Sequence, residues 1–448
     1  MTNQLPVTKT TLDNGLTVVL KEMHHAPVTS FMIWYRVGSR QETPGITGVS
    51  HWVEHMMFKG TPTFPQGTLD RMVSREGGHW NAFTWLDFTA YYETLPANRI
   101  DLALQLEADR MVNTQMSEAA VESERQVILA ERGMYENDPH FSLNEELTST
   151  AFRVHSYRHE IIGDEVDLRS MTRADLLNHY RHYYVPNNAV AVVVGDFETA
   201  VMREKICHHF NPIPRGKPPE LVTRQEPPQK GERRLTLEGP GDAPYLTVAY
   251  HAPAATHPDY FPLTLLNAAF AGGSSLGMFG SAGSNKSSRL YKALVATELA
   301  AGAIGGMMPT IDPHLYTISA IVNNGRSLPE VEEALYAELA RLAAEPITQA
   351  ELDKALKRAK AEFVMAGESI TGQTQLLGMA ETITGDYRWF ETVLDKLQAV
   401  TLADIERVRD QYLRKRNRTV GWYQPVEHPD TGGEDNAHGS AGNAVMVK

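Results

Sequence analysis

The spacing of apolar and polar positions changes along the first part of the chain. Residues 16–22, "LTVVLKE", and 29–39, "TSFMIWYRVGS", alternate or cluster β-branched and aromatic residues, a pattern typical of strands. From about Thr47 to Lys59 the apolar residues recur with helical spacing, and Gly60 is well placed to end that helix. The chain is therefore predicted to begin with two strands that a helix follows.

Further elements follow along the first half of the chain. Helical spacing recurs at 100–112 and at 118–136, where Ser117 is positioned as the N-cap of the second helix. The apolar run "NAVAVVVGDF" at 188–197 predicts a buried strand with a turn after it. Beyond that strand, 211–233 is rich in Pro, Lys and Arg and poor in apolar residues, which is typical of a linker.

A similar order of elements recurs after this linker. Strand-like runs at 233–240 and 245–254 precede an apolar helix at 260–272, and a long helical pattern follows at 348–367. We interpret this as an internal duplication, which predicts an α+β fold of two α/β halves, each a mostly antiparallel sheet flanked by helices, enclosing a cleft. The expected division is 1–215 for the first domain, 216–233 for the linker, 234–424 for the second domain and 425–448 for a disordered tail.

Composition and charge narrow the classes of function. The chain has 448 residues, 42% hydrophobic and 22% charged, which is ordinary for a globular protein of two or three domains. Its net charge of -13, without a long basic run, argues against nucleic acid as a main partner. The single cysteine, Cys207, excludes an intramolecular disulfide framework and a cysteine-rich zinc site. Because no leader pattern or long apolar run is present, we expect no membrane insertion and a cytoplasmic location, or a periplasmic one if a leader was removed.

The helix predicted at 47–59 contains the pentapeptide "HWVEH". On a helix His51 and His55 lie one turn apart on the same face, so two imidazole nitrogens can converge on one metal ion. Zinc binds histidine nitrogens at about 2.0–2.1 Å and in catalytic sites takes three protein ligands and a water. Glu54 lies near the same face and could act as general base toward that water. A polar helix with a chance histidine pair stays open as the alternative on the pentapeptide alone.

The helix predicted at 118–136 offers a third ligand. Glu124 and Glu131 are seven residues apart, which places them two turns apart on one helical face beside apolar neighbours. A glutamate that faces the protein interior is costly unless it is paired or bound to a metal. The alternative is that these carboxylates lie on a solvated face, which is our interpretation of the other glutamates of this helix.

These motifs together resemble the pitrilysin/insulinase family of zinc metallopeptidases, in the branch of mitochondrial processing peptidase and its bacterial relatives. The resemblance extends from "LDNGLTVVL" through "GVSHWVEHMMFKGT" and "GGHWNAFTWLDFTAYYETLP" to "YRHEIIGDEVDLRSMT" and "YYVPNNAVAVVVGDF". It implies that His51, His55 and Glu131 bind one zinc ion, that Glu54 is the catalytic base, and that Glu124 supports the ligands.

A strand-like segment at 79–83 follows two glycines in "GGHWNAFTW". An edge strand with free N–H and C=O groups can hold an extended peptide by strand addition. In the family the corresponding Asn-Ala segment does this, so the resemblance implies that Asn81 and Ala82 position a peptide substrate. His79 and Phe83 are further candidates for substrate binding, with core packing as the alternative for Phe83.

The second half departs from the family pattern. Family members that act alone usually carry an arginine and a tyrosine seven apart that bind the substrate carbonyl, whereas this chain has Val295 and Gly302 there. Arg289 and Tyr291 lie just upstream with the wrong spacing. The resemblance therefore implies a heterodimer in which a homologous partner subunit supplies the pair. The glycine- and serine-rich segment 271–291 also resembles the glycine-rich loop of processing-peptidase partners, with a mobile surface loop as the alternative.

The sequence thus predicts a zinc-dependent endopeptidase that hydrolyses short or unfolded peptides with a metal-activated water and a glutamate base. Two alternatives stay open. One is a non-catalytic subunit of the same fold, against which the retention of all four motif residues argues, namely His51, Glu54, His55 and Glu131. The other is a zinc enzyme of different chemistry on a related fold, which the predicted peptide-binding strand disfavours.

Overall fold

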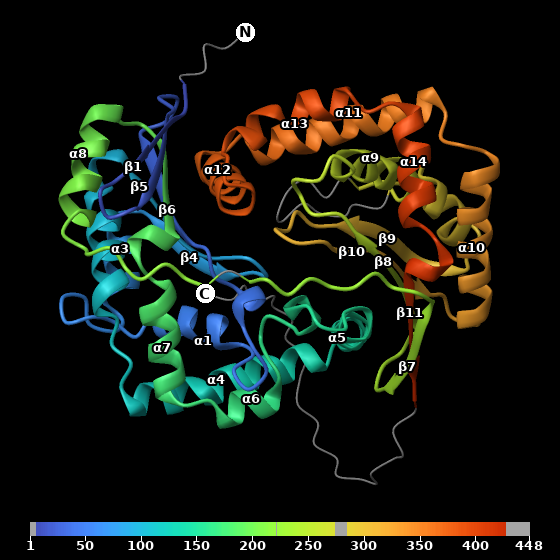
Figure 1. Cartoon of the computed structure of the whole chain (residues 1–448), viewed down its shortest axis with the longest axis horizontal. Helices are drawn as coiled ribbons and strands as arrows, with labels where there is room; N and C mark the ends of the chain where they lie inside the picture. Colours follow the sequence, from blue (N-terminus) through green and yellow to red (C-terminus); the bar gives the residue numbers. More distant parts are fainter. Residues whose placement is uncertain (1–5, 221, 274–284, 427–448) are drawn as a thin grey trace, which may run out of the picture.

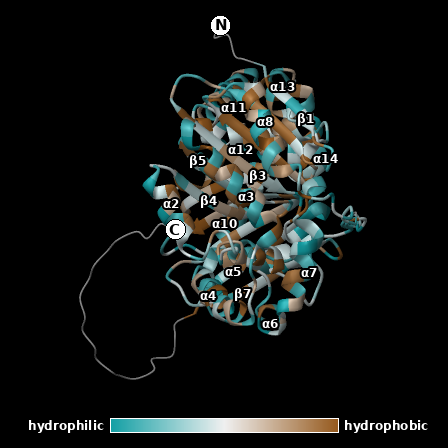
Figure 2. Ribbon diagram, turned by 90° about the vertical axis from the view of Figure 1, so that its left-hand side faces the viewer, coloured by the Kyte–Doolittle hydropathy of each residue, from teal (hydrophilic) through white to brown (hydrophobic). Residues whose placement is uncertain are grey.

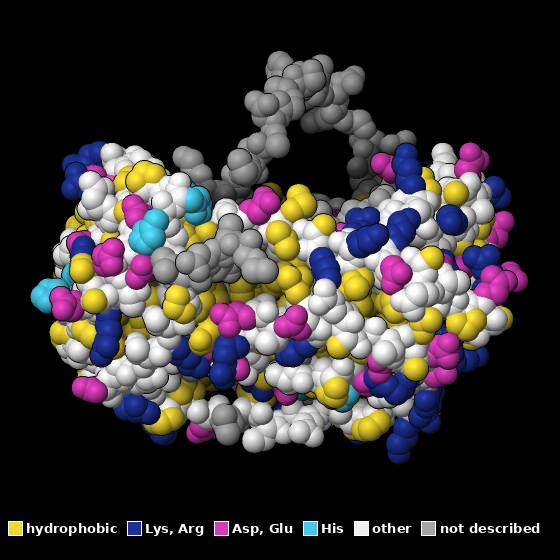
Figure 3. Space-filling view, turned by 90° about the horizontal axis from the view of Figure 1, so that it is seen from above, with side chains coloured by type: hydrophobic (Ala, Val, Ile, Leu, Met, Phe, Trp, Pro, Cys, Tyr) yellow, Lys and Arg dark blue, Asp and Glu magenta, His cyan; other side chains and the backbone are white. Residues whose placement is uncertain are grey.

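The computed structural model of the chain describes residues 6–220, 222–273 and 285–426. Two halves lie side by side, each built around one β-sheet with helices packed against it (Figure 1). Hydrophobic residues, brown in Figure 2, concentrate on the strands and on the helices that pack against them. On the face seen from above, acidic and basic side chains are interspersed (Figure 3). No helix in the described ranges is both long and apolar enough to cross a membrane.

The first half contains a six-stranded sheet in the order β1-β2-β6-β3-β5-β4. Neighbouring strands are antiparallel except β2 and β6, which are parallel. The strands are β1 Thr8–Thr11, β2 Thr17–Glu22, β3 Val28–Tyr35, β4 His79–Thr84, β5 Thr89–Pro96 and β6 Ala189–Gly195. The strands predicted at 16–22, 29–39 and 188–197 are therefore confirmed. Strand β4 lies at one edge of the sheet, so one side of its backbone has no neighbouring strand among the described residues.

The second half repeats this pairing with five strands in the order β7-β11-β8-β10-β9. Strands β7 and β11 are parallel and the other neighbours antiparallel, so these strands match β2, β6, β3, β5 and β4 in turn. They are β7 Arg233–Gly239, β8 Tyr245–Ala252, β9 Ala300–Met307, β10 His314–Val322 and β11 Arg418–Pro425. The predicted α+β fold of two mostly antiparallel sheets is confirmed.

The predicted domain boundaries stay predictions. The first strand of the second sheet, β7, begins at Arg233. The last helix of the first half, α8 Thr199–Phe210, ends before the predicted linker at 216–233. The predicted disordered tail lies outside the described residues from position 427 onward, and positions 274–284 of the glycine-rich segment do so too.

Helices cover both sheets. Those of the first half are α1 Val49–Met56, α2 Thr68–Arg75, α3 Asp101–Asn113, α4 Glu118–Glu136, α5 Pro139–Ala151, α6 Glu165–Ser170, α7 Arg173–Tyr183 and α8 Thr199–Phe210. Those of the second half are α9 Tyr260–Phe270, α10 Leu328–Ala344, α11 Gln349–Ala366, α12 Ile370–Thr384, α13 Arg388–Gln398 and α14 Leu402–Tyr412. The helices predicted at 100–112, 118–136, 260–272 and 348–367 are confirmed as α3, α4, α9 and α11.

The helix predicted at 47–59 forms, but over fewer residues, as α1. Gly48, directly before it, has a φ of 85°, and Gly60 beyond its end has a φ of 92°. An added Cβ on Gly48 would lie 2.3 Å from the carbonyl oxygen of Ile162, so only glycine fits this close approach of two loops. The start of α1 is therefore set by tertiary contact, which the sequence pattern did not reveal.

One helix from each half packs against the sheet of the other half (Figure 1). Helix α5 packs on β7, β8 and β11 of the second sheet, and α12 packs on β3 and β6 of the first. On the α12 side, the Nζ of Lys21 donates a buried hydrogen bond of 2.7 Å to the Oε1 of Gln373. At the closest approach, Gly378 of α12 lies against the indole of Trp34 on β3. Both contacts must break before the halves can separate, so the exchange holds them in one arrangement.

Replacing Gly378 with Ala should destabilise the fold. The new Cβ would lie 2.0 Å from the Nε1 of Trp34, which is fully buried and has little room to move. Overpacking of this kind costs about 1–3 kcal/mol, which urea unfolding would measure as a lower free energy of unfolding. The matched control is Gly133→Ala in α4, where an added Cβ meets nothing within 4 Å. This control should be neutral or stabilising by up to ~1 kcal/mol, and equal effects of both substitutions would contradict the close packing of α12 on β3.

Candidate metal centre

Helix α1 presents its two histidines side by side. The ring centroids of His51 and His55 are 4.6 Å apart, one helical turn along the same face. The start of the helix is held by the buried Glu42, whose carboxylate accepts the N–H groups of Gly48 at 2.7 Å and Ser50 at 2.8 Å. The first N–H groups of a helix have no partner inside it, so this carboxylate satisfies two donors at the start of α1. Its negative charge also interacts favourably with the positive end of the helix dipole.

Helix α4 brings Glu131 to these histidines. The Oε2 of Glu131 lies 3.6 Å from the Nε2 of His55 and 3.9 Å from the Nε2 of His51. In a tetrahedral zinc site, ligand atoms about 2.0–2.2 Å from the ion are about 3.3–3.6 Å apart. The two separations that involve Glu131 need to shorten by only a few tenths of an ångström, and all three ligand atoms lie within 4.8 Å of one another. Across the described ranges, no other group of three His, Cys, Asp or Glu side chains converges in this way.

The second glutamate predicted on this helix, Glu124, lies behind the histidines. Its Oε1 pairs with the Nδ1 of His55 at 2.9 Å, and its Oε2 pairs with the ammonium group of Lys59. Burial acts to raise the pKa of Glu124, but the hydrogen bonds from His55 and Lys59 outweigh burial and lower it. An ionised carboxylate at Nδ1 fixes the ring of His55 and leaves its Nε2 directed at Glu131. Sequence analysis did not find Lys59, which lies four residues after His55.

The protonation of the histidines differs. Burial lowers the pKa of His51 to about 3, so its ring is neutral and keeps a lone pair for a metal ion. Burial also opposes protonation of His55, but the hydrogen bond with Glu124 and the nearby carboxylates raise its pKa. A histidine must lose a proton to bind metal, so binding at His55 competes with that proton.

Glu54 lies buried beside the two histidines. The hydroxyl of Thr84, the last residue of β4, donates a hydrogen bond of 2.6 Å to its Oε2. Burial raises the pKa of Glu54 to about 7, although the bond from Thr84 acts in the opposite direction. Thr84 was not found from the sequence; the signal was its place in the alternation of β4, on the same face as Ala82.

The four residues predicted to bind substrate lie on β4 but on two faces. Side chains alternate along a strand. Ala82 packs against the core that contains α1, while His79, Asn81 and Phe83 share the opposite face. Phe83 packs edge to face against the indole ring of Trp34 on β3, with 5.8 Å between the ring centroids. This contact fits the packing alternative for Phe83. The Oδ1 of Asn81 accepts the N–H of Ala82 at 2.9 Å. In the described residues β4 pairs only with β5.

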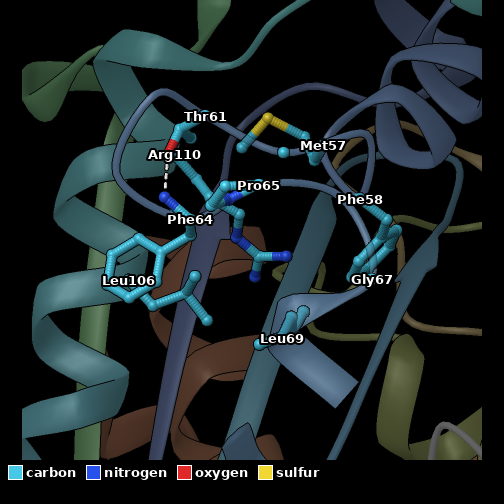
Figure 4. A pocket seen from close by; sticks show the side chains of 10 residues that line it. Met57, Phe58, Thr61, Phe64, Pro65, Gly67, Leu69, Leu106 and Arg110 are labelled. Atoms are coloured by element: carbon cyan, nitrogen blue, oxygen red, sulfur yellow. Dashed lines mark hydrogen bonds between the residues drawn. The ribbon is translucent and has the colours of Figure 1, made fainter. Parts of the chain in front are cut away.

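A charged cluster that the sequence analysis did not single out supports the end of α1. Arg110 of α3 is buried, with its guanidinium 5.0 Å from the ring centroid of Phe58, and it pairs with Glu107 and Glu93. The guanidinium lies among the side chains that line a small pocket formed largely by residues 57–69 (Figure 4). Burial holds the pKa of Glu93 well above its ordinary value. In the sequence, this cluster could have been found from the charged residues inside the apolar helical pattern "LEADRM" at 106–111.

The second half shows no arginine and tyrosine at the positions expected from the family. Val295 ends a short π-helical turn, Tyr291–Val295, and Gly302 lies on the edge strand β9. The nearby Arg289 is committed elsewhere, because its guanidinium donates twice to the carboxylate of Glu351, each time at 2.8 Å. Within the described residues, neither expected position therefore offers a side-chain donor.

Replacing Glu124 with Gln should weaken zinc binding without removing a ligand. A neutral amide loses the charge that holds His55 and Lys59, and changes of this kind typically cost 10–100-fold in metal affinity. Competition with a zinc chelator would measure the affinity. Glu122→Gln is the control, because this glutamate on the same helix has a side chain 63% exposed and pairs with Arg125. Unchanged affinity in the Glu124 variant would contradict its place behind His55.

Two family models match the chain. The model described as "Insulinase (Peptidase family M16)" matches residues 17–165, which contain α1, β4 and α4. The model described as "Peptidase M16 inactive domain" matches residues 170–359, which contain most of the second half. The histidine motif lies in the first match, and the second match begins within the first half, before α7, and ends in α11.

Named relatives extend over nearly the whole chain. The zinc protease PqqE of Helicobacter pylori is 29% identical over 421 residues, which cover 93% of this chain and 92% of the relative. The mitochondrial-processing peptidase subunit beta of Lentinula edodes is 27% identical over 418 residues, which cover 92% and 89%. The crystal structure of a protease from Helicobacter pylori has a TM-score of 0.88 at 28% identity and covers 94% of this chain and 100% of that one. The chain therefore belongs to the insulinase family of peptidases, family M16, and is similar to its bacterial zinc proteases and to processing-peptidase beta subunits.

Proposed function

We propose that this chain is the zinc-bearing subunit of an endopeptidase that hydrolyses short or unfolded peptides. One observation carries the proposal, namely the convergence of His51, His55 and Glu131 beside the buried carboxylate of Glu54. Membership of family M16 and relatives named zinc proteases support the same reaction class.

The donor atoms of the site suit zinc. Two imidazole nitrogens and one carboxylate oxygen form a ligand set that zinc accepts in catalytic sites. In this proposal His51, His55 and Glu131 hold the ion, and Glu124 orients His55. When bound, zinc would polarise a peptide carbonyl and lower the pKa of a water molecule.

Glu54 is the proposed general base. Its carboxyl has a pKa of about 7 because it is buried, which is near the value at which a group accepts and releases protons readily at neutral pH. Glu54 would take a proton from the attacking water and then donate it to the amide nitrogen as the peptide bond breaks. The two peptide fragments leave as a carboxylate and an amine.

The edge of β4 is the proposed peptide-binding surface. An extended peptide would add as a further strand beside β4, with its backbone bonded to the strand around Asn81 and Ala82. His79 lies on the strand face opposite α1 and would contact substrate side chains from there, whereas Phe83 on the same face packs against Trp34. Strand addition uses backbone groups, so this surface suits unfolded segments of varied sequence. The two halves would enclose the peptide in a cleft.

A homologous partner subunit is the proposed source of the missing donors. Val295 and Gly302 have no side-chain donor, and Arg289 is held by Glu351. The loss of one donor to the reacting carbonyl typically costs about 10²–10³-fold in turnover. The relative from Lentinula edodes is itself named a subunit. A partner chain with an arginine and a tyrosine would complete the site in a heterodimer.

A non-catalytic subunit of the same fold is the second candidate function. The model that matches the second half is described as an inactive domain, which favours this candidate for that half. The first half keeps both histidines, Glu54 and Glu131, and His55 and Glu54 have supporting hydrogen bonds from Glu124 and Thr84. These contacts would have no selective value in a purely structural subunit, so they favour the enzyme.

The test is hydrolysis of an unstructured, fluorescence-quenched peptide by the purified chain, alone and mixed with a homologous chain from the same source. We expect weak hydrolysis by the chain alone, an increase of about 10²-fold or more in the mixture, and loss of activity with a chelator that added zinc reverses. Absence of zinc-dependent hydrolysis in both samples would overturn the proposed function. Full activity of a strict monomer would overturn the heterodimer alone.

A further inference from the structure

We propose that Thr84 is a positioning residue, whose hydroxyl holds the Glu54 carboxylate in place beside the metal centre and in register with the peptide-binding strand. This inference rests on the proposed peptidase function. The Oγ1 of Thr84 donates to the Oε2 of Glu54 at 2.6 Å, and both residues are only 7% exposed. A short, buried bond from a hydroxyl to a carboxylate is among the stronger side-chain hydrogen bonds.

Two oxygens lie within reach of the Thr84 proton. The Oε2 of Glu54 is 2.6 Å from the Thr84 hydroxyl, and the hydroxyl oxygen of Thr89 is 3.3 Å away. Thr89 donates its own single proton to the carbonyl oxygen of Val37 at 2.9 Å, so toward Thr84 it can act only as an acceptor. The carboxylate is the nearer acceptor and the charged one, so the bond to Glu54 is the stronger of the two.

The sheet holds Thr84 itself in position. It is the last residue of β4 and pairs with Thr89 of β5. A β-branched side chain on a strand has few accessible χ1 rotamers, so the place of the hydroxyl follows from the backbone. The same strand carries Asn81 three residues and Ala82 two residues earlier. A peptide added to β4 would thus be registered to the base through one rigid strand.

Holding Glu54 by one oxygen also affects the metal centre. A carboxylate so close to three ligands is itself a possible fourth zinc ligand. Catalytic zinc sites keep one position open for water, whereas sites with four protein ligands are structural. The bond from Thr84 engages Oε2, so this oxygen would have to give up its hydrogen bond to join the metal ligands.

The decisive variants are Thr84→Val, which keeps the shape and removes the hydroxyl, and Thr84→Ser, which keeps the hydroxyl. We expect Thr84→Val to lower kcat about 10–100-fold with KM changed less than about 2-fold, in line with the loss of a hydrogen bond to a charged group. Thr84→Ser should retain kcat within about 3-fold. If Thr84→Val fails to fold, the Thr84→Ala and Thr84→Ser pair makes the same comparison.

A second measurement does not depend on activity. Cobalt-loaded Thr84→Val should show a changed visible spectrum because Glu54 is free to join the metal ligands, whereas Thr84→Ser should match the unchanged protein. Adding Glu54→Gln to Thr84→Val should restore the original spectrum. Wild-type kcat and spectrum in Thr84→Val, or equal losses in the Val and Ser variants, would overturn the positioning role. Failure of the peptidase function is distinguishable, because it would leave the unchanged protein itself without zinc-dependent hydrolysis.

Discussion

Peptide hydrolysis should fall by about 10²–10⁴-fold when Glu54 is replaced by Gln, while zinc binding stays close to that of the unchanged protein. Glutamine has nearly the same shape and can still accept the hydrogen bond from Thr84. It cannot take a proton from water at neutral pH, so the variant loses the proposed base and keeps the metal ligands. The measurement is kcat of the chain together with its proposed partner subunit, with zinc content measured on the same samples.

The control for this substitution is Glu118→Gln, at a position whose side chain is 82% exposed at the start of α4. It makes the same chemical change far from the proposed base and should leave kcat within about 2-fold. If Glu54→Gln kept both zinc and full activity, the role proposed for Glu54 would be wrong. If the variant lost its zinc, Glu54 would instead be contributing to metal binding.

Replacing Glu131 with Ala should remove most of the bound zinc. The substitution takes away the oxygen that lies 3.6 Å and 3.9 Å from the two histidine nitrogens and leaves two protein ligands. Loss of a ligand should exceed the 10–100-fold loss of affinity typical for a residue behind the ligands. Metal analysis after dialysis and chelator competition would measure the change, and hydrolysis should fall with it.

Adding excess zinc distinguishes the loss of a metal ligand in Glu131→Ala from the loss of the base in Glu54→Gln. In Glu131→Ala, high zinc should restore part of the activity because the base is intact, whereas it should restore none in Glu54→Gln. Glu122→Ala is the control, on the same helix with a side chain 63% exposed. Stoichiometric zinc at ordinary concentrations in Glu131→Ala would mean that another residue is the third ligand.

Local patterns predicted the elements that carry the candidate site. The one-turn spacing of His51 and His55 and the apolar periodicity of 118–136 depend only on near neighbours, and α1 and α4 form as that spacing implies. The N-cap at Ser117 is also local, with its hydroxyl accepting the N–H of Ala120 at 3.1 Å. Helical periodicity is therefore readable wherever a helix buries one face.

Local sequence patterns could not show which of the two glutamates of α4 lies at the Nε2 atoms of the histidines. Glu124 and Glu131 share one helical face and are equivalent by spacing. The crossing of α4 over α1 puts Glu131 at the Nε2 side of the histidines and Glu124 at the Nδ1 side of His55. Family resemblance anticipated this difference, but no periodicity in a single sequence contains it.

The sequence by itself determined the helices and strands with clear periodicity, the duplicated order of elements and the histidine pair one turn apart on a helix. Only the tertiary structure decided the bond between Thr84 and Glu54 and the exchange of α5 and α12 between halves. Secondary structure follows from the side chains of neighbours a few residues apart. These other features join residues such as Lys21 and Gln373, 352 positions apart, which no local periodicity links.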